Sequence, residues 1–176
     1  MPQYRRCVIP GATYFFTLAL SDRTSSLLVD EVERLRSAYR KVVAKLPVTT
    51  VAITVMPDHM HTIWTMPPDE ADYSRRWNMI KGAFSKGLPA TTDRSASEVT
   101  KREKGIWQRR FWEHRVRDDE DLRRCVDYIH FNPVKHGLVN RAADWPYTSF
   151  HRYVKQGLLH ADWGTALDSI GEDFGE

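Results

Sequence analysis

Four stretches of the chain have the apolar pattern of β-strands. Residues 13–20 form a β-branched and aromatic run after a Pro-Gly pair, and apolar side chains alternate with small ones over residues 51–55. Residues 59–66 follow after a three-residue connection that is short enough for a hairpin. We therefore expect 51–55 and 59–66 to pair antiparallel, with 59–66 central in the sheet. A fourth strand is expected at residues 106–116, where bases and aromatics mix.

Apolar positions at helical spacing predict three longer helices and a short one. The first two cover residues 30–46 and 72–87. The third spans residues 118–132 and begins with a run of four acids, which complement the helix dipole. We expect it to end before Pro133, because a residue that precedes proline avoids the α region. A last short helix is expected to start within residues 144–150.

The resulting order is strand, helix, strand, strand, helix, strand, helix. This order predicts an α+β fold of the ferredoxin-like (RRM-like) type, an antiparallel sheet with helices on one face. The face that these helices leave uncovered is then the expected place for function. Residues 1–163 are expected to form a single domain, with a mobile loop at about 88–105 and an acidic C-terminal tail at 164–176.

The basic charge of the chain is concentrated in its body. The net charge is +3, but residues 161–176 hold five of the 23 acids and no base, which leaves 26 bases against 18 acids elsewhere. A basic and aromatic-rich body favours a nucleic-acid partner, although ordinary solvated basic faces would give the same composition. Two cysteines without C-x-x-C spacing, no signal-peptide pattern and no apolar run of membrane-spanning length predict a cytoplasmic protein.

Two histidines provide the first candidate chemistry. His59 and His61 are two residues apart in an expected strand, so both side chains point from the same face and could share a divalent cation. Tyr128 and Asn132 are four residues apart on the third helix and lie off its apolar stripe, so they project from the same side and the tyrosine is expected to be less buried than a core aromatic. Two imidazoles and an amide oxygen leave open positions on an ion, and the phenol could act as a nucleophile.

Several segments together resemble a known family. Pro-Asp-His-Met-His at residues 57–61 has the form of the His-hydrophobe-His motif of HUH single-strand nucleases. Tyr-Ile-His-Phe-Asn at 128–132, followed by Pro-Val-Lys-His-Gly-Leu-Val, is similar to their one-tyrosine helix. Residues 107–114 and 144–149 resemble segments of one branch, the REP-associated tyrosine transposases. The resemblance runs from Tyr4 to about Trp163.

The resemblance implies an HUH endonuclease fold with a divalent metal, Mg²⁺ or Mn²⁺, held by His59, His61 and Asn132. Tyr128 would attack single-stranded DNA, form a 5′-phosphotyrosine and release a 3′-OH, and a later attack would join strands. The family acts on repetitive extragenic palindromes, recognising a hairpin and a short tetranucleotide beside its foot. Related insertion-sequence transposases commonly have glutamine where this chain has the shorter Asn132. The resemblance to the REP-associated branch favours a monomer over a dimer.

Eight bases are candidates for DNA contact, with solvated faces as the alternative: Arg5, Arg6, Arg109, Arg110, Arg115, Arg117, Arg124 and Lys135. The sequence assigns no role to Glu113, His114, His130 or His136. Two other functions stay open at this point. One is a non-catalytic nucleic-acid-binding module on an RRM-like sheet, and the other is a metal-dependent phosphodiesterase that uses water.

Overall fold

The computed structural model describes residues 8–165, which are built on an antiparallel sheet of four strands in the order β2-β3-β1-β4. The central strand β3 pairs with both β1 and β2, and β4 pairs with the other side of β1. The expected hairpin and the central place of the histidine strand are therefore confirmed. The strands are β1 (Thr13–Ala19), β2 (Thr49–Val55), β3 (His59–Thr65) and β4 (Trp112–Arg115).

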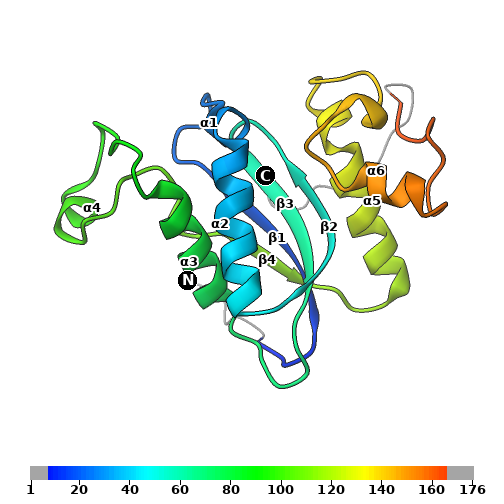
Figure 1. Ribbon diagram of the computed structural model, residues 1–176, viewed down its shortest axis with the longest axis horizontal. Helices are drawn as coiled ribbons and strands as arrows, with labels where there is room; N and C mark the ends of the chain where they lie inside the picture. Colours follow the sequence, from blue (N-terminus) through cyan, green and yellow to red (C-terminus); the bar gives the residue numbers. More distant parts are fainter. Residues whose placement is uncertain (1–7, 166–176) are drawn as a thin grey trace, which may run out of the picture.

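Two helices cover one face of this sheet, as Figure 1 shows. Alternation along β1 and β3 points Phe16, Met60 and Trp64 toward α2 and α3, where they form the larger core. Trp64 stacks on Trp77 of α3 with ring centroids 3.9 Å apart. The helices are α1 (Leu27–Asp30), α2 (Val32–Lys45), α3 (Tyr73–Ser85), α4 (Ala96–Thr100), α5 (Asp119–Lys135), the 3₁₀ helix η1 (Ala142–Asp144) and α6 (Phe150–Lys155).

The helix that carries the candidate tyrosine lies on the opposite face of the sheet (Figure 1). Val126 and Ile129 of α5 pack in a second core with Phe15 of β1 and Ile63 of β3. The ferredoxin-like α+β fold is confirmed, and the structure adds that α5 partly covers the face expected to be open. The face is still the functional candidate, because it also carries both histidines of β3.

The predicted end of the third helix was wrong. Helix α5 continues through Pro133 to Lys135, although proline lacks the N–H that would bond the preceding turn. The next amides close the turn, since His136 N donates to the Asn132 carbonyl over 3.0 Å and Leu138 N donates to the Pro133 carbonyl over 3.0 Å. Pro133 is also buried, so packing contributes to holding this last turn in place.

Other boundaries differ from the pattern-based expectation. Only Trp112–Arg115 of the expected 106–116 strand forms β4, and Trp107 makes an isolated bridge to Leu20. The expected loop at 88–105 contains the short helix α4, which begins with a capping box between Ser95 and Glu98. The last helix, α6, starts at Phe150, the final residue of the segment expected to begin it.

Some sequence-based predictions fall outside the described residues. Arg5, Arg6 and residues 166–176 of the acidic tail belong to this group. The domain limits 1–163 and 164–176 stay predictions. Among residues 8–165, no helix has the length and apolar character needed to cross a bilayer.

Candidate active site

The two histidines of β3 lie side by side on the face that α5 covers. His59 pairs with Ala19 and His61 with Thr17 in the β1–β3 register, and both imidazoles are buried. Their ring centroids are 5.0 Å apart. Both rings therefore point to the same side of the sheet, as the two-residue period of a β-strand predicted.

One nitrogen of each ring is held by a neighbouring oxygen. His59 Nδ1 lies 2.8 Å from Asp58 Oδ1, and His61 Nδ1 lies 2.9 Å from Thr17 Oγ1. When Nδ1 carries the proton and donates it to these oxygens, the lone pair of each ring is on Nε2. Such contacts fix the tautomer and orientation of metal-binding histidines, which leaves both buried Nε2 atoms as the candidate ligand atoms.

The protonation state of His59 also suits a ligand. Burial lowers the pKa of His59 below its usual value, and the hydrogen bond to Asp58 acts in the opposite direction without cancelling this effect. The ring is therefore neutral near pH 7, which is the form that binds a metal ion.

Helix α5 brings three residues to these histidines at a spacing of four. The Tyr128 ring is 5.4 Å from the His61 ring, and the His136 ring is 5.1 Å from the His59 ring, both between centroids. Asn132 is midway between Tyr128 and His136 in the sequence and shares their side of the helix. The structure brings His59, His61 and Tyr128 together, and helical spacing adds Asn132, which is buried with its Oδ1 atom. These four residues are here called the candidate site.

The expected partial exposure of Tyr128 was wrong. Tyr128 is 2% exposed and belongs to the core between α5 and the sheet, and Asn132 is fully buried. The Tyr128 ring meets Phe15 edge-on at a centroid distance of 6.0 Å. The apolar stripe of α5 is thus wider than its aliphatic residues alone indicate, because the tyrosine side also faces the sheet.

Lys135 contacts the candidate nucleophile directly. Its Nζ donates to Tyr128 Oη over 3.2 Å and lies 4.9 Å from the centroid of the same ring. A positive charge at this distance stabilises negative charge that develops on the phenol oxygen. Lys135 was predicted as a DNA contact, and the structure places it beside the phenol oxygen.

The donor set fits a divalent cation of intermediate hardness. Two imidazole nitrogens and one amide oxygen suit Mn²⁺ or Zn²⁺, whereas Mg²⁺ prefers an all-oxygen environment. Three protein ligands also leave coordination positions for a substrate oxygen. Of the two metals that the sequence analysis expected, the residues present therefore fit Mn²⁺ better than Mg²⁺, with His59 Nε2, His61 Nε2 and Asn132 Oδ1 as the atoms to hold it.

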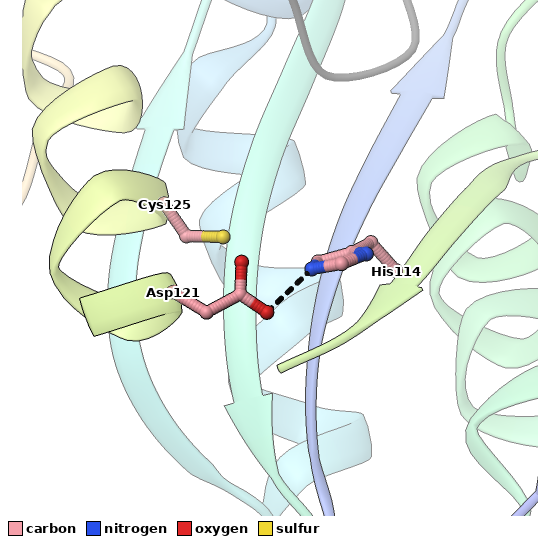
Figure 2. A group of neighbouring side chains, drawn as sticks. All are labelled: His114, Asp121 and Cys125. Carbon is pink, nitrogen blue, oxygen red and sulfur yellow. Dashed lines mark hydrogen bonds and ion pairs between the residues drawn. The ribbon is translucent and has the colours of Figure 1, made fainter. Parts of the chain in front are cut away.

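A second group of potential ligands lies at the other end of α5. Figure 2 shows Asp121 and Cys125 of α5 pointing toward His114 of β4, and their ligand atoms lie within 4.8 Å of one another. The His114 Nε2 to Asp121 Oδ2 distance is 2.9 Å. This group includes none of the residues of the candidate site.

The Asp121 carboxylate already has several donors. Arg117 donates to Oδ2 from its backbone N and its Nε, each over 3.0 Å, and Arg124 lies 3.7 Å from Oδ1. Burial acts to raise the pKa of Asp121, but the hydrogen bonds from Arg117 and His114 outweigh it and hold this pKa well below its usual range. We therefore interpret His114, Arg117 and Asp121 as a structural link between β4 and α5, here called the α5–β4 clamp.

The predicted DNA-binding arginines fall into separate groups. Arg109 pairs with Glu103 beside α4 at 2.8 Å, whereas Arg117 and Arg124 surround Asp121. Arg110 lines a cavity of about 360 Å³ together with Thr17, Arg23 and Trp112, next to the residues that hold the histidines. Arg115 is exposed at the end of β4.

Sequence reasoning missed three neighbours of the candidate site. Thr17 and Asp58 contact the histidines through Nδ1, and His136 lies against His59. The position of Asp58, directly before His59, was a local signal. Thr17 depends on the strand register, and His136 depends on α5 continuing past Pro133, so neither could be found by spacing alone.

Comparisons with known proteins show which proteins this chain resembles. A sequence model of the family described as IS200-like transposases matches residues 9–132. An Escherichia coli protein named REP-associated tyrosine transposase is 44% identical over 174 residues, which cover 98% of both chains. A Haemophilus influenzae protein that provisionally bears the same name is 47% identical over 165 residues, or 93% of this chain and 94% of that protein. A solved structure of a REP-associated tyrosine transposase bound to a REP hairpin superimposes with a TM-score of 0.82 at 44% identity and covers 98% of both chains.

Proposed function

The chain belongs to the family of IS200-like transposases, and from this membership we propose that it cleaves and rejoins single-stranded DNA through a covalent bond to Tyr128. The observation that carries the proposal is that Tyr128 lies against both a candidate metal ligand and a basic side chain. Its ring lies 5.4 Å from that of the candidate ligand His61, and its hydroxyl accepts a hydrogen bond from Lys135 over 3.2 Å.

The reaction follows from the position of the phenol. Tyr128 Oη attacks the phosphorus of a phosphodiester, an Oη–P bond forms and the P–O3′ bond breaks. The phenol proton leaves, the released 3′ oxygen takes up a proton, and the downstream strand stays attached as a 5′-phosphotyrosine. Lys135 stabilises the phenolate during the attack, because its ammonium group lies beside Oη.

A divalent metal at His59, His61 and Asn132, Mn²⁺ or Mg²⁺, would supply Lewis-acid polarisation of the phosphoryl oxygen and orient it. The protein holds the two rings rigidly through Thr17 and Asp58, so the ligands do not reorganise when substrate binds. Attack by a DNA 3′-OH on the phosphotyrosine reverses the chemistry and joins strands. Because each step exchanges one phosphodiester for another, the proposal requires no nucleotide cofactor.

The substrate class is taken from the relatives. A solved relative is bound to a REP hairpin, and we propose a hairpin with a single-stranded flank as the partner of this chain. Arg110 and Trp112 line the cavity next to the candidate site and could bind a phosphate and stack on a base of such a flank. We further propose that the protein acts as a monomer, on the basis of the family resemblance.

The test uses an oligonucleotide with a hairpin and a single-stranded flank, labelled at its 3′ end, together with Mn²⁺. The 3′ label should appear in a protein–DNA adduct that resists denaturation, because the 5′-phosphate of the downstream strand remains on the tyrosine. The same oligonucleotide labelled at its 5′ end should instead release a free labelled fragment. Tyr128→Phe should abolish the adduct while it preserves the fold.

Tyr153→Phe is the matched control, since it removes a tyrosine hydroxyl that donates to the Val51 carbonyl over 3.0 Å and, among residues 8–165, hydrogen-bonds to none of the candidate metal ligands. It should leave the adduct yield unchanged. An undiminished adduct from Tyr128→Phe would refute the assigned nucleophile. Cleavage without an adduct would point to the water-using phosphodiesterase, and metal-independent binding without cleavage would point to the non-catalytic binding module.

A further inference from the structure

Asp58 lies between the candidate ligand His59 and the basic side chain of Arg23. Its two carboxylate oxygens are used separately, because Oδ1 lies 2.8 Å from His59 Nδ1 and Oδ2 lies 2.6 Å from Arg23 Nε. The side chain of Asp58 is 15% exposed and that of Arg23 is 41% exposed. The three groups therefore form a chain that leads from solvent to the buried imidazole.

The backbone holds this chain in place. Asp58 belongs to the connection between β2 and β3, and its carbonyl accepts a hydrogen bond of 2.8 Å from Leu20 N, at the end of β1. Arg23 follows Leu20 by three residues. The segment that hydrogen-bonds to the β2–β3 connection through Leu20 therefore also carries the guanidinium that contacts Asp58. The position of the carboxylate is thus fixed from both sides before any metal or DNA binds.

We propose that Asp58 and Arg23 are positioning residues for the metal at the candidate site. The inference rests on the proposed function, since it assigns these two residues a role toward the metal that His59 would hold. Asp58 accepts the Nδ1 proton of His59, which places the ring lone pair on Nε2 and fixes the ring plane. Arg23 holds the other oxygen and so prevents the carboxylate from rotating away.

The acceptor that His59 contacts differs in charge from the acceptor that the second histidine contacts. His61 Nδ1 meets the neutral hydroxyl of Thr17, whereas His59 Nδ1 meets a carboxylate. The contact of Asp58 Oδ2 with Arg23 Nε, at 2.6 Å, is an ion pair that favours the charged carboxylate. An anionic acceptor makes an imidazole a stronger ligand than a neutral acceptor does.

The experiment measures Mn²⁺ affinity in the full-length chain without DNA, from the loss of the electron paramagnetic resonance signal of free Mn²⁺. Asp58→Ala should weaken Mn²⁺ binding about 10- to 100-fold, the range typical of partners that orient metal ligands. Asp58→Asn keeps an acceptor but loses the charge, so its loss should be smaller. Arg23→Gln should weaken binding by less than about 10-fold, and should add nothing in the Asp58→Ala background because both act through one carboxylate.

Asp22→Asn is the matched control. It removes the same charge one residue from Arg23, and Asp22 accepts its hydrogen bonds from the N and Oγ1 of Thr24, over 2.9 and 2.7 Å, outside the Arg23–Asp58–His59 chain. Its Mn²⁺ affinity should equal that of the parent protein. Thermal unfolding of every variant separates a loss of fold from a loss of ligand orientation, and Asp58→Asn preserves side-chain size if Asp58→Ala unfolds.

Two results would overturn the inference and they are distinguishable. If His59→Ala loses Mn²⁺ binding while Asp58→Ala, Asp58→Asn and Arg23→Gln keep parental affinity, the positioning role is wrong and the metal site stands. If His59→Ala itself keeps parental Mn²⁺ affinity, the metal part of the proposed function fails and the inference fails with it.

Discussion

Helix α5 carries a histidine-containing cluster near each end, and the two clusters differ in where their polar atoms are directed. At the C-terminal end, the candidate site has Nδ1 of both His59 and His61 held by neighbouring oxygens, with Nε2 as the remaining ring nitrogen. At the N-terminal end, the carboxylate of Asp121 is surrounded by donors from Arg117 and His114.

This difference separates a catalytic candidate from a structural contact. Both clusters bridge a strand and α5, both contain histidine, and both are largely buried. The α5–β4 clamp directs its charges at each other, so an added cation would have to displace Arg117 or His114 from Asp121. The candidate site instead uses its outer contacts to orient its ligands.

The largest expected effect comes from removing a ligand at each end of the helix. His61→Ala should reduce the Mn²⁺-dependent adduct by at least about 100-fold, because losing a ligand exceeds the loss seen for an orienting partner. His114→Ala should keep both adduct yield and Mn²⁺ affinity. The comparison is measured with the labelled hairpin in a denaturing gel. If His61→Ala and His114→Ala lose the adduct to the same extent, the different roles assigned to the two clusters are contradicted.

Asp121→Asn should have the opposite effect from His61→Ala: it should lower the stability of the fold and leave adduct formation intact. The variant loses hydrogen bonds from charged partners that are partly exposed, so we expect a free energy of unfolding lower by about 2 kcal/mol. Urea unfolding followed by circular dichroism measures this change. Asp118→Asn is a control at the N-cap, where the side chain accepts only from Asp121 N over 2.8 Å. A stable Asp121→Asn variant that loses Mn²⁺ binding would identify the clamp as the metal site.

Lys135 tests the chemistry at the candidate site more finely. Lys135→Met removes the positive charge beside Tyr128 Oη and should slow adduct formation about 10-fold, a typical size for one stabilising contact of 1–2 kcal/mol. Lys135→Arg should restore much of the rate. Single-turnover kinetics at saturating DNA separate this effect from weaker DNA binding. Equal rates for Lys135→Met and the parent protein would contradict the assigned role.

The buried histidine within α5 gives the smallest expected effect and extends the comparison to pH. His130 is buried against Ser149 Oγ at 2.9 Å, and burial, reinforced by Arg152 and His151, lowers its pKa from 6.5 to about 3. Between these values the unfolded chain binds a proton that the folded chain does not, so stability falls as the pH falls below 6.5.

We expect a loss of about 1 kcal/mol from this group between about pH 6.5 and 5.5, measured by urea unfolding at both pH values. His130→Gln should remove this part of the pH dependence, whereas the exposed His151→Gln should retain it. An unchanged slope in His130→Gln would show that the folded protein accepts the proton, contrary to the buried and neutral state assigned here.

Local pattern was sufficient for most of the sheet and for each of the two residue pairs that make up the candidate site. The period of two in residues 59–65 put both histidines on one face, and the short connection before them set the antiparallel hairpin. The spacing of four also placed Tyr128 and Asn132 together on α5. These features depend on residues that are close in sequence, so they can be predicted from one amino-acid sequence.

The rest depends on contacts between distant segments. Burial of Tyr128 results from α5 lying on the second face of the sheet, and His136 reaches His59 only because α5 continues past Pro133. Two of the arginines proposed as DNA contacts instead pair with acids four to six residues away, Arg109 with Glu103 and Arg117 with Asp121. Nothing in their spacing distinguishes a DNA contact from an internal ion pair.

The central claim is a covalent bond between DNA and Tyr128, and peptide mass spectrometry of the adduct tests it most directly. After nuclease and protease digestion, the account predicts a 5′-linked nucleotide on the peptide that contains Tyr128, formed only when Mn²⁺ or Mg²⁺ is present. A nucleotide on a different tyrosine, or complete cleavage of the hairpin substrate with no modified peptide, would contradict it.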